Sequence, residues 1–110
     1  MRNLVNGRNA VDPWVLRSRA VETVGYLPGD ILIVDLNERP RPRDLVCAQV
    51  VDWAGGRAET VFRLYEPPYL IAATGDTRLL KPFVVDDDVV IIRGVVVSSL
   101  RPRRNIEIAA

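Results

Sequence analysis

Residues 25–35 constrain the fold of this chain more than any other segment. They read Gly-Tyr-Leu-Pro-Gly-Asp followed by Ile-Leu-Ile-Val-Asp. Glycine and proline placed close together favour a tight turn, and a continuous aliphatic, β-branched run favours a β-strand covered on both faces. We therefore predict a polar turn that ends at Asp30 and leads into a buried strand over residues 31–35.

A second strong signal is a pair of β-rich runs, residues 45–52 and 58–65, which flank Trp-Ala-Gly-Gly-Arg. A Gly-Gly pair between two such runs predicts a β-hairpin. In the second run Thr60, Phe62 and Leu64 would share one face of the strand. Further strands are expected over residues 14–16, 69–73 and 89–100, the last with a bulge or bend at Gly94.

These signals predict a mostly β fold with little helix. Helical periodicity is nowhere sustained, and the chain carries eight prolines and seven glycines. We expect compact, bent β-sheets that form a partly open barrel. A chain of 110 residues buries a single core. We assign residues 1–12 to a linker or N-terminal arm, 13–104 to the folded domain and 105–110 to a tail.

Composition excludes many functions. The net charge of +1 gives no electrostatic reason to expect direct contact with nucleic acid. The chain has no histidine and one cysteine, which removes the commonest general base and the usual zinc ligand sets. Cys47 lies in an apolar run and is expected to be buried in a reducing compartment. With no signal peptide and no membrane-spanning stretch in the sequence, we expect a cytoplasmic protein.

The order and spacing of three segments resemble the C-terminal domain of LexA and phage CI-type repressors. That domain has the fold of the Ser-Lys self-cleaving peptidases. The segments are Gly29-Asp30 before an apolar strand, Thr60-Val61-Phe62-Arg63-Leu64, and Gly94-Val95-Val96-Val97 near the C-terminus. The resemblance covers residues 14–101 and implies that Gly25, Gly29 and Asp30 form a structural turn.

The resemblance also implies a serine nucleophile at position 20 and a lysine base at position 62, where this chain has Ala20 and Phe62. A hydroxyl nucleophile needs an adjacent base, and an amine is that base only when burial lowers its pKa. A methyl group cannot attack a peptide bond, and a phenyl ring cannot accept a proton. Moving the register by one residue restores neither group, so we predict that the chain is not an active peptidase.

An enzymatic alternative is a residual peptidase that uses Ser18 as nucleophile and Lys81, the sole lysine, as base. Ser18 would share a strand face with Ala20 but would lie roughly 6–7 Å away along the strand. Lys81 would have to come from a different loop. The resemblance further implies a cleavage site several tens of residues before the nucleophile, and only nineteen residues precede Ala20.

Charged runs offer weaker signals. Asp86-Asp87-Asp88 could attract a hard cation, but adjacent carboxylates do not readily converge on one ion, so we expect a solvated turn and no metal or cofactor. The arginines of residues 39–43 and 101–104 are interpreted as solubilising loops, with phosphate contact as the minor alternative. Trp14 and Trp53 are core or interface aromatics.

We thus expect an oligomerisation and regulatory domain of a LexA-like or phage-type repressor that has lost self-cleavage. The resemblance implies that a helix-turn-helix domain outside this chain binds DNA and that this domain forms a homodimer. The candidate dimer interface is an apolar strand that we expect at a sheet edge, consisting of Val95, Val96, Val97, Ser98, Ser99 and Leu100. A further alternative is a stand-alone antagonist that forms mixed dimers with a full-length repressor.

Overall fold

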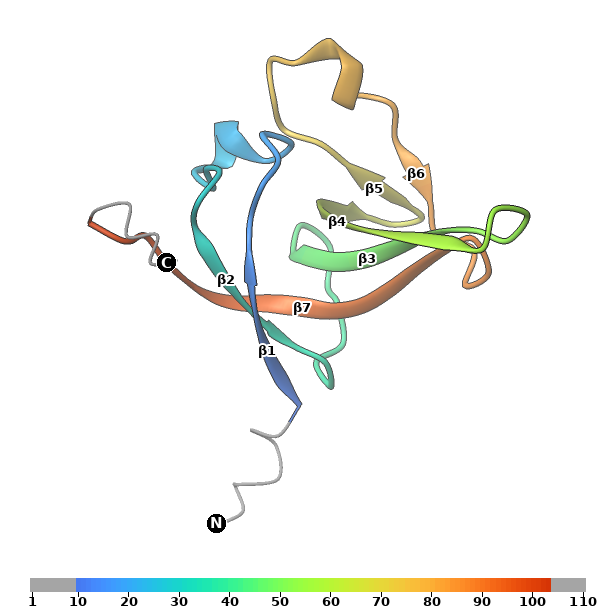
Figure 1. Ribbon diagram of the computed structural model, residues 1–110, viewed down its shortest axis with the longest axis horizontal. Coiled ribbons are helices and arrows are strands. Elements are labelled where there is room, and N and C mark those ends of the chain that lie inside the picture. The colour runs from blue at the N-terminus through green and yellow to red at the C-terminus, as the bar shows by residue number, and fades with distance from the viewer. Residues whose placement is uncertain (1–9, 104–110) are drawn as a thin grey trace.

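The computed structural model describes residues 10–103, so the predictions for residues 1–9 of the arm and for the tail fall outside the described part of the chain. The described residues form a single antiparallel sheet in the order β1-β2-β7-β3-β4-β5-β6 (Figure 1). The sheet is strongly bent but does not close into a barrel. Its strands are β1 (Val11–Val15), β2 (Ile31–Asp35), β3 (Leu45–Asp52), β4 (Arg57–Glu66), β5 (Tyr69–Ile71), β6 (Phe83–Val84) and β7 (Val90–Leu100).

The prediction of a mostly β fold with little helix is confirmed for residues 10–103, since 47% of them are in strands and no helix among them reaches seven residues. Two short 3-10 helices, η1 (Glu22–Val24) and η2 (Thr77–Leu79), complete the elements. In residues 10–103 no helix is long and apolar enough to cross a membrane. The strands β2 to β5 and β7 lie where their sequence patterns predicted them, whereas β6 was not predicted. Strand β1 begins at Val11, inside the stretch assigned to the arm.

The long strand β7 joins the two halves of the sheet. It pairs with β3 through its first half and with β2 through its second half. The ladder with β3 shifts register opposite Gly94, where the bend was expected. A Cβ atom at Gly94 would lie 2.7 Å from both the Asp35 carbonyl oxygen and the Val34 Cγ1 atom. Glycine is therefore required here because β2 passes very close to the β7 backbone.

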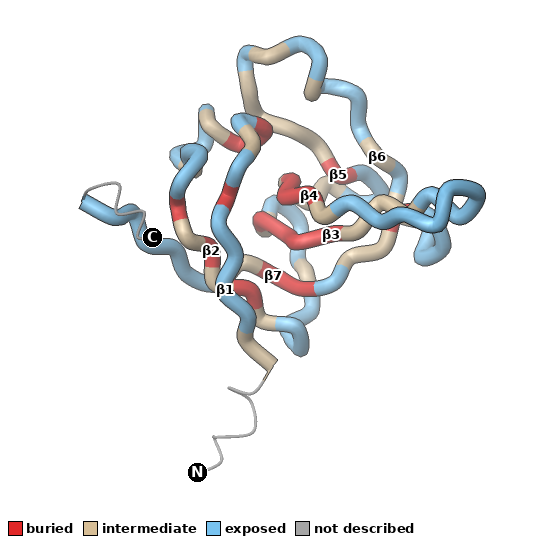
Figure 2. The backbone as a smooth tube through the Cα atoms, viewed as in Figure 1, coloured by how far each residue is buried: buried red, intermediate tan, exposed pale blue. Residues whose placement is uncertain are grey.

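The two faces of the sheet build two apolar clusters. On one face, side chains from β2, β3, β4 and the segment between β1 and η1 form the first cluster, which consists of Leu16, Val21, Leu32, Val34, Leu45, Cys47 and Phe62. On the opposite face, β3, β4, β5 and β7 form the second cluster, which consists of Val46, Ala48, Val61, Leu70, Val90 and Val95. The central strand β3 is buried on both faces because it supplies alternate residues to each cluster (Figure 2).

Strand β2 differs from its prediction. Its continuous apolar run predicted cover on both faces, but only Leu32 and Val34 are fully buried, while Ile31 and Ile33 remain partly exposed. The reason is topological: β1 and the second half of β7 flank β2 in the sheet, and neither cluster extends over Ile31 and Ile33, which point away from the first cluster. The prediction of a doubly covered β2 is therefore wrong for the described residues.

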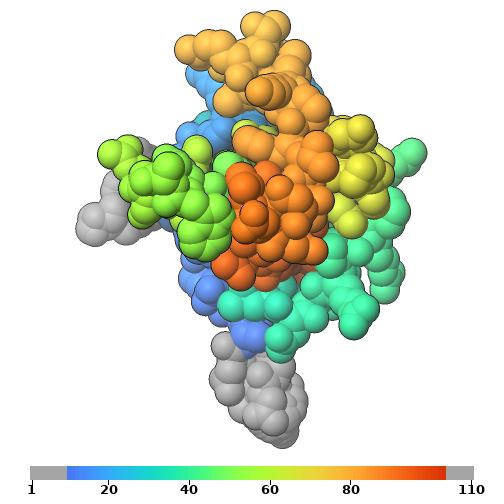
Figure 3. Space-filling view, turned by 90° about the vertical axis from the view of Figure 1, so that its right-hand side faces the viewer, coloured from blue at the N-terminus to red at the C-terminus, as the bar shows by residue number. Residues whose placement is uncertain are grey.

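The β3–β4 hairpin lies beside the loop that precedes β7 (Figure 3). The Trp53 indole N–H donates to the Asp88 carbonyl oxygen at 3.2 Å, and the Val51 N–H donates to the Val89 carbonyl oxygen at 2.8 Å. The Asp86 carboxylate accepts three backbone N–H groups, those of Asp88, Val89 and Val90. These bonds lower the pKa of Asp86, with the bond from Val90 as the largest cause. The three aspartates thus form a hydrogen-bonded turn.

Candidate functional site

Ala20 lies between β1 and η1 and is completely buried. Its backbone N–H donates to the Ser18 hydroxyl oxygen at 3.0 Å, and its carbonyl oxygen accepts from the Ala73 N–H at 2.7 Å. The Thr23 N–H in turn donates to the Ala73 carbonyl oxygen at 3.0 Å. Two backbone hydrogen bonds therefore hold the segment around position 20 against the loop that follows β5.

Phe62 lies in β4 opposite Cys47 and is 6% exposed. Its ring meets the Trp14 ring edge to face, with 6.2 Å between centroids and 67° between planes. Aromatic pairs favour this geometry because the positive edge of one ring meets the negative face of the other. Phe62 belongs to the same buried cluster as Val21, the residue after Ala20. The side chains at positions 20 and 62 are therefore both hydrocarbon and both buried.

Arg63 is the basic side chain next to position 62. It is 6% exposed, its Nη1 donates to the Phe62 carbonyl oxygen at 2.9 Å, and its guanidinium lies 5.5 Å from the Phe83 ring centroid. Its Nε has no hydrogen-bond partner among the described residues. Burial lowers the pKa of Arg63, but a guanidinium starts so high that it stays protonated. Arg63 therefore cannot act as a general base.

Ser18 and Lys81, the residues of the alternative peptidase, are engaged separately. The Ser18 hydroxyl oxygen accepts the Ala20 N–H within a short local turn. Lys81 is exposed beyond η2, and no hydrogen bond or ion pair joins it to another side chain within residues 10–103. A nucleophile and its base must lie within hydrogen-bond reach. The described structure does not bring these two residues together in that way.

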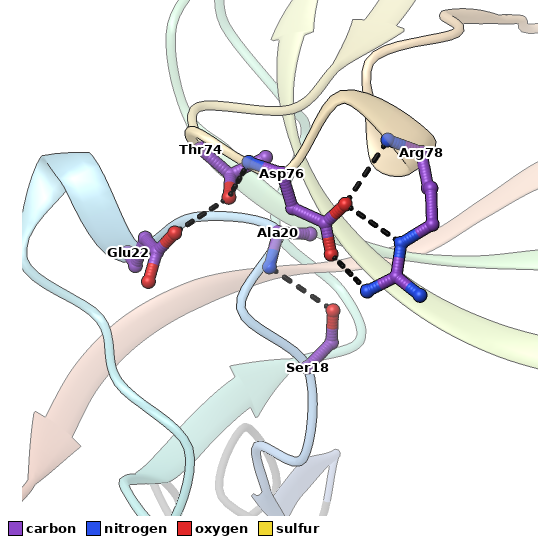
Figure 4. A network of polar contacts seen from close by, with 6 residues as sticks. All are labelled: Ser18, Ala20, Glu22, Thr74, Asp76 and Arg78. Atoms are coloured by element: carbon purple, nitrogen blue, oxygen red, sulfur yellow. Dashed lines mark hydrogen bonds and ion pairs between the residues drawn. The ribbon is translucent and has the colours of Figure 1, made fainter.

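The polar residues around position 20 form a connected network that the sequence did not predict (Figure 4). The Thr74 hydroxyl donates to a Glu22 carboxylate oxygen at 2.6 Å and accepts from the Asp76 N–H at 3.0 Å. The Asp76 carboxylate caps η2 and pairs with Arg78 at 2.8 Å. The hydrogen bonds from Arg78 lower the pKa of Asp76 to about 2. Because these groups satisfy one another, the network fixes the loop after β5 to η1.

A groove of about 280 Å³ lies on the first-cluster face, near the Phe62–Trp14 pair. Its lining consists of Asp12, Trp14, Leu36, Cys47, Gln49, Thr60 and Arg93. The Arg93 Nε donates to the Gln49 side-chain oxygen at 2.9 Å. Burial, and secondarily the Asp12 charge, raise the pKa of the Cys47 thiol to about 11. The thiol is therefore protonated at neutral pH and is not a nucleophile.

Gly25, Gly29 and Asp30 form the turn before β2. Both glycines have left-handed backbone conformations, with φ of 101° and 97°. Asp30 is 3% exposed, and its carboxylate accepts the Leu27 N–H at 2.9 Å. Arg101, just beyond β7, donates to both carboxylate oxygens of Asp30 at 2.8 and 2.9 Å and to the Gly25 carbonyl oxygen at 2.8 Å. The turn is therefore closed by a charged side chain from 71 positions later in the chain.

The candidate dimer strand lies inside the sheet order, between β2 and β3. Val95 is buried and pairs on both sides, with Asp35 and with Val46. Beyond Val95 the ladder with β3 ends, and the residues up to Leu100 pair only with β2 among the described strands. The expectation of an edge strand therefore fits the second half of β7 and not Val95. Val97 and Leu100 are 52% and 59% exposed.

In residues 10–103 no group of three or more His, Cys, Asp or Glu side chains is arranged to hold a metal ion. Comparison with known proteins found no family model that matches the chain and no matching relative among curated proteins.

Proposed function

We propose that this chain is the oligomerisation and regulatory domain of a LexA-like or phage-type transcriptional repressor that does not cleave itself. The observation that carries the proposal is the second half of β7, which pairs only with β2 among residues 10–103 and so leaves one edge open there, and where Val97 and Leu100 are exposed. Such an edge presents unpaired backbone groups and is a template for a second strand. A symmetric contact between two copies would form there.

Pairing through this domain would act on DNA indirectly. A dimer places two recognition helices on two half-sites, and the second contact then occurs at a high effective concentration. The helix-turn-helix domain would lie outside the described residues, which hold no helix of seven residues or more. We place the protein in the cytoplasm, with its single cysteine reduced.

The loss of self-cleavage is supported by the side chains at positions 20 and 62. Both are buried and apolar, and Arg63 beside them keeps its proton. No observation favours the residual peptidase, because Ser18 and Lys81 have separate surroundings. Removing both members of a nucleophile–base pair leaves only binding and electrostatic terms for catalysis.

The molar mass of the chain in solution, measured by analytical ultracentrifugation over a concentration series, tests the oligomerisation proposal. We expect a dimer whose dissociation constant rises at least tenfold in Val97→Lys, because a solvated ammonium opposes strand pairing at the open edge. Val84→Lys is the matched control, since Val84 is 51% exposed but lies on β6. A strictly monomeric wild-type protein at high concentration contradicts the proposal, whereas co-purification with a helix-turn-helix repressor would favour the antagonist role.

Incubation at alkaline pH, followed by gel electrophoresis, tests the absence of peptidase activity. We expect the wild-type chain to remain intact, because neither a hydroxyl nor an amine occupies the two positions. Two fragments that disappear in Ser18→Ala would overturn this part of the proposal. The fold of Ser18→Ala would be checked by circular dichroism, since the hydroxyl accepts the Ala20 N–H.

A further inference from the structure

The outer face of β1, β2 and the second half of β7 is apolar and uncovered among the described residues. Cross-strand pairing places side chains in two rows on this face: Val15, Ile31 and Leu100 in the first row, and Pro13, Ile33 and Ser98 in the second. Val15 is 48% exposed and Leu100 is 59% exposed. None of the six residues belongs to either buried cluster. We call these six residues the outer face.

The composition of β2 indicates that this face is normally covered. Leu32 and Val34 fill the first cluster, yet Ile31 and Ile33 on the opposite side are equally apolar. Strands with aliphatic residues on both sides are typical of sheets that are buried on both sides. Within one copy nothing in the described chain supplies that second layer, as Figure 2 shows for β1 and the pale end of β7.

We propose that a second copy of this chain covers the outer face, so that the dimer interface extends from the β7 edge across β2 to β1. This inference rests on the proposed oligomerisation function and names the surface that the partner buries. Leu100 and Ser98 belong both to the outer face and to the open edge of β7. A partner that contacts these two residues at the edge therefore contacts one member of each row.

The absence of charge favours an identical partner. In a two-fold symmetric contact, a residue near the axis lies close to the same residue of the other copy. A charged residue there would therefore be repelled by its counterpart. The two rows contain five apolar residues and one serine, and no charged side chain. Beyond the rows, Arg101 and Asp30 neutralise each other at the end of β7, and Asp35 follows on the same face at the margin, in the next row between Val11 and Val95. Two outer faces can thus pack without an unpaired charge at the centre.

A matched pair of valine substitutions tests the inference on the full 110-residue chain. Val15→Glu places a carboxylate in the first row, and Val24→Glu places one in η1 at nearly the same exposure, 48% against 46%. We expect the dimer dissociation constant from analytical ultracentrifugation to rise at least tenfold in Val15→Glu and to stay within twofold of wild type in Val24→Glu. Leu100→Glu, in the same row, is expected to behave like Val15→Glu. Thermal unfolding by circular dichroism would show that all variants are folded.

The possible outcomes separate this inference from the function on which it rests. A wild-type dimer that Val97→Lys weakens but Val15→Glu and Leu100→Glu leave intact overturns the outer-face contact and keeps the edge contact. Equal losses in Val15→Glu and Val24→Glu also overturn it, because the effect would then follow from charge alone. A monomeric wild-type chain removes both.

Discussion

The guanidinium of Arg101 donates two hydrogen bonds to the buried carboxylate of Asp30 and thereby connects the end of β7 to the turn before β2. Asp30→Asn keeps the size of the side chain but loses the ion pair and one acceptor. Since hydrogen bonds to charged groups are worth more than neutral ones, we expect a loss of about 1–3 kcal/mol in the free energy of unfolding. Urea denaturation checks this, with Asp44→Asn as the control, because the partly exposed Asp44 carboxylate accepts the backbone N–H of Arg41 and has no ion pair among the described residues.

The same pair predicts how stability depends on pH. The hydrogen bond from Arg101 is the main cause that lowers the pKa of Asp30 in the folded protein. A carboxyl whose folded pKa is depressed adds stability above its unfolded value, about 4, and that stability is lost as pH falls through the folded pKa. The stability difference between wild type and Asp30→Asn should therefore be constant from pH 6 to 8 and shrink below pH 4. A difference that grows on acidification would contradict the assignment.

Gly94→Ala tests the close approach of β2 and β7. The added methyl group would meet the Asp35 carbonyl oxygen and a Val34 methyl at 2.7 Å, so the bulge must shift. We expect a loss of about 1–3 kcal/mol in unfolding free energy, as in other overpacked sites. Gly75→Ala is the control, because a Cβ there meets nothing within 4 Å. Equal stability of the two variants would show that β7 has room at its bend.

Cys47 provides a probe of the folded state. Burial raises its pKa to about 11, and the residue is 3% exposed, so the reactive thiolate is scarce and shielded at pH 8. We expect a disulfide reagent such as DTNB to modify the native protein at least a hundredfold more slowly than the protein unfolded in guanidinium chloride. Fast modification of the native protein would mean that the groove opens to the thiol.

Much of the fold could be predicted because its signals are local. The Gly-Gly pair marks the hairpin between β3 and β4, and the apolar run after Asp30 marks β2. Strand β6 has two residues and no period of its own, so only its pairing with β5 defines it. The partial exposure of Ile31 and Ile33 could not be predicted from the residues of β2. It depends on which strands, distant in sequence, lie beside β2 and pack over that side of it.

The candidate site likewise combines features that are local in the sequence with contacts between residues far apart in it. The sequence names Ala20 and Phe62, and the structure adds that both are buried. The contacts of Asp30 with Arg101 and of Glu22 with Thr74 join residues that are 71 and 52 positions apart. No local sequence pattern predicts such pairs. The Asp-x-Arg spacing at Asp76 and Arg78 is a local signal that could have revealed the cap of η2.

Pro13, in the outermost strand β1, has a consequence for what happens at high concentration. Proline has no amide hydrogen, and in edge strands it occupies positions where that hydrogen would face solvent. A strand that paired with the outer side of β1 would therefore lack one hydrogen-bond donor at Pro13. The opposite margin of the sheet, β6, is two residues long and offers little to extend. In the proposed dimer, the β7 edge of each copy would pair with that of the other, so neither edge would remain free. The molecule is therefore poorly suited to nucleate fibrils, and we expect no fibrils to form by end-to-end addition of copies in concentrated solutions.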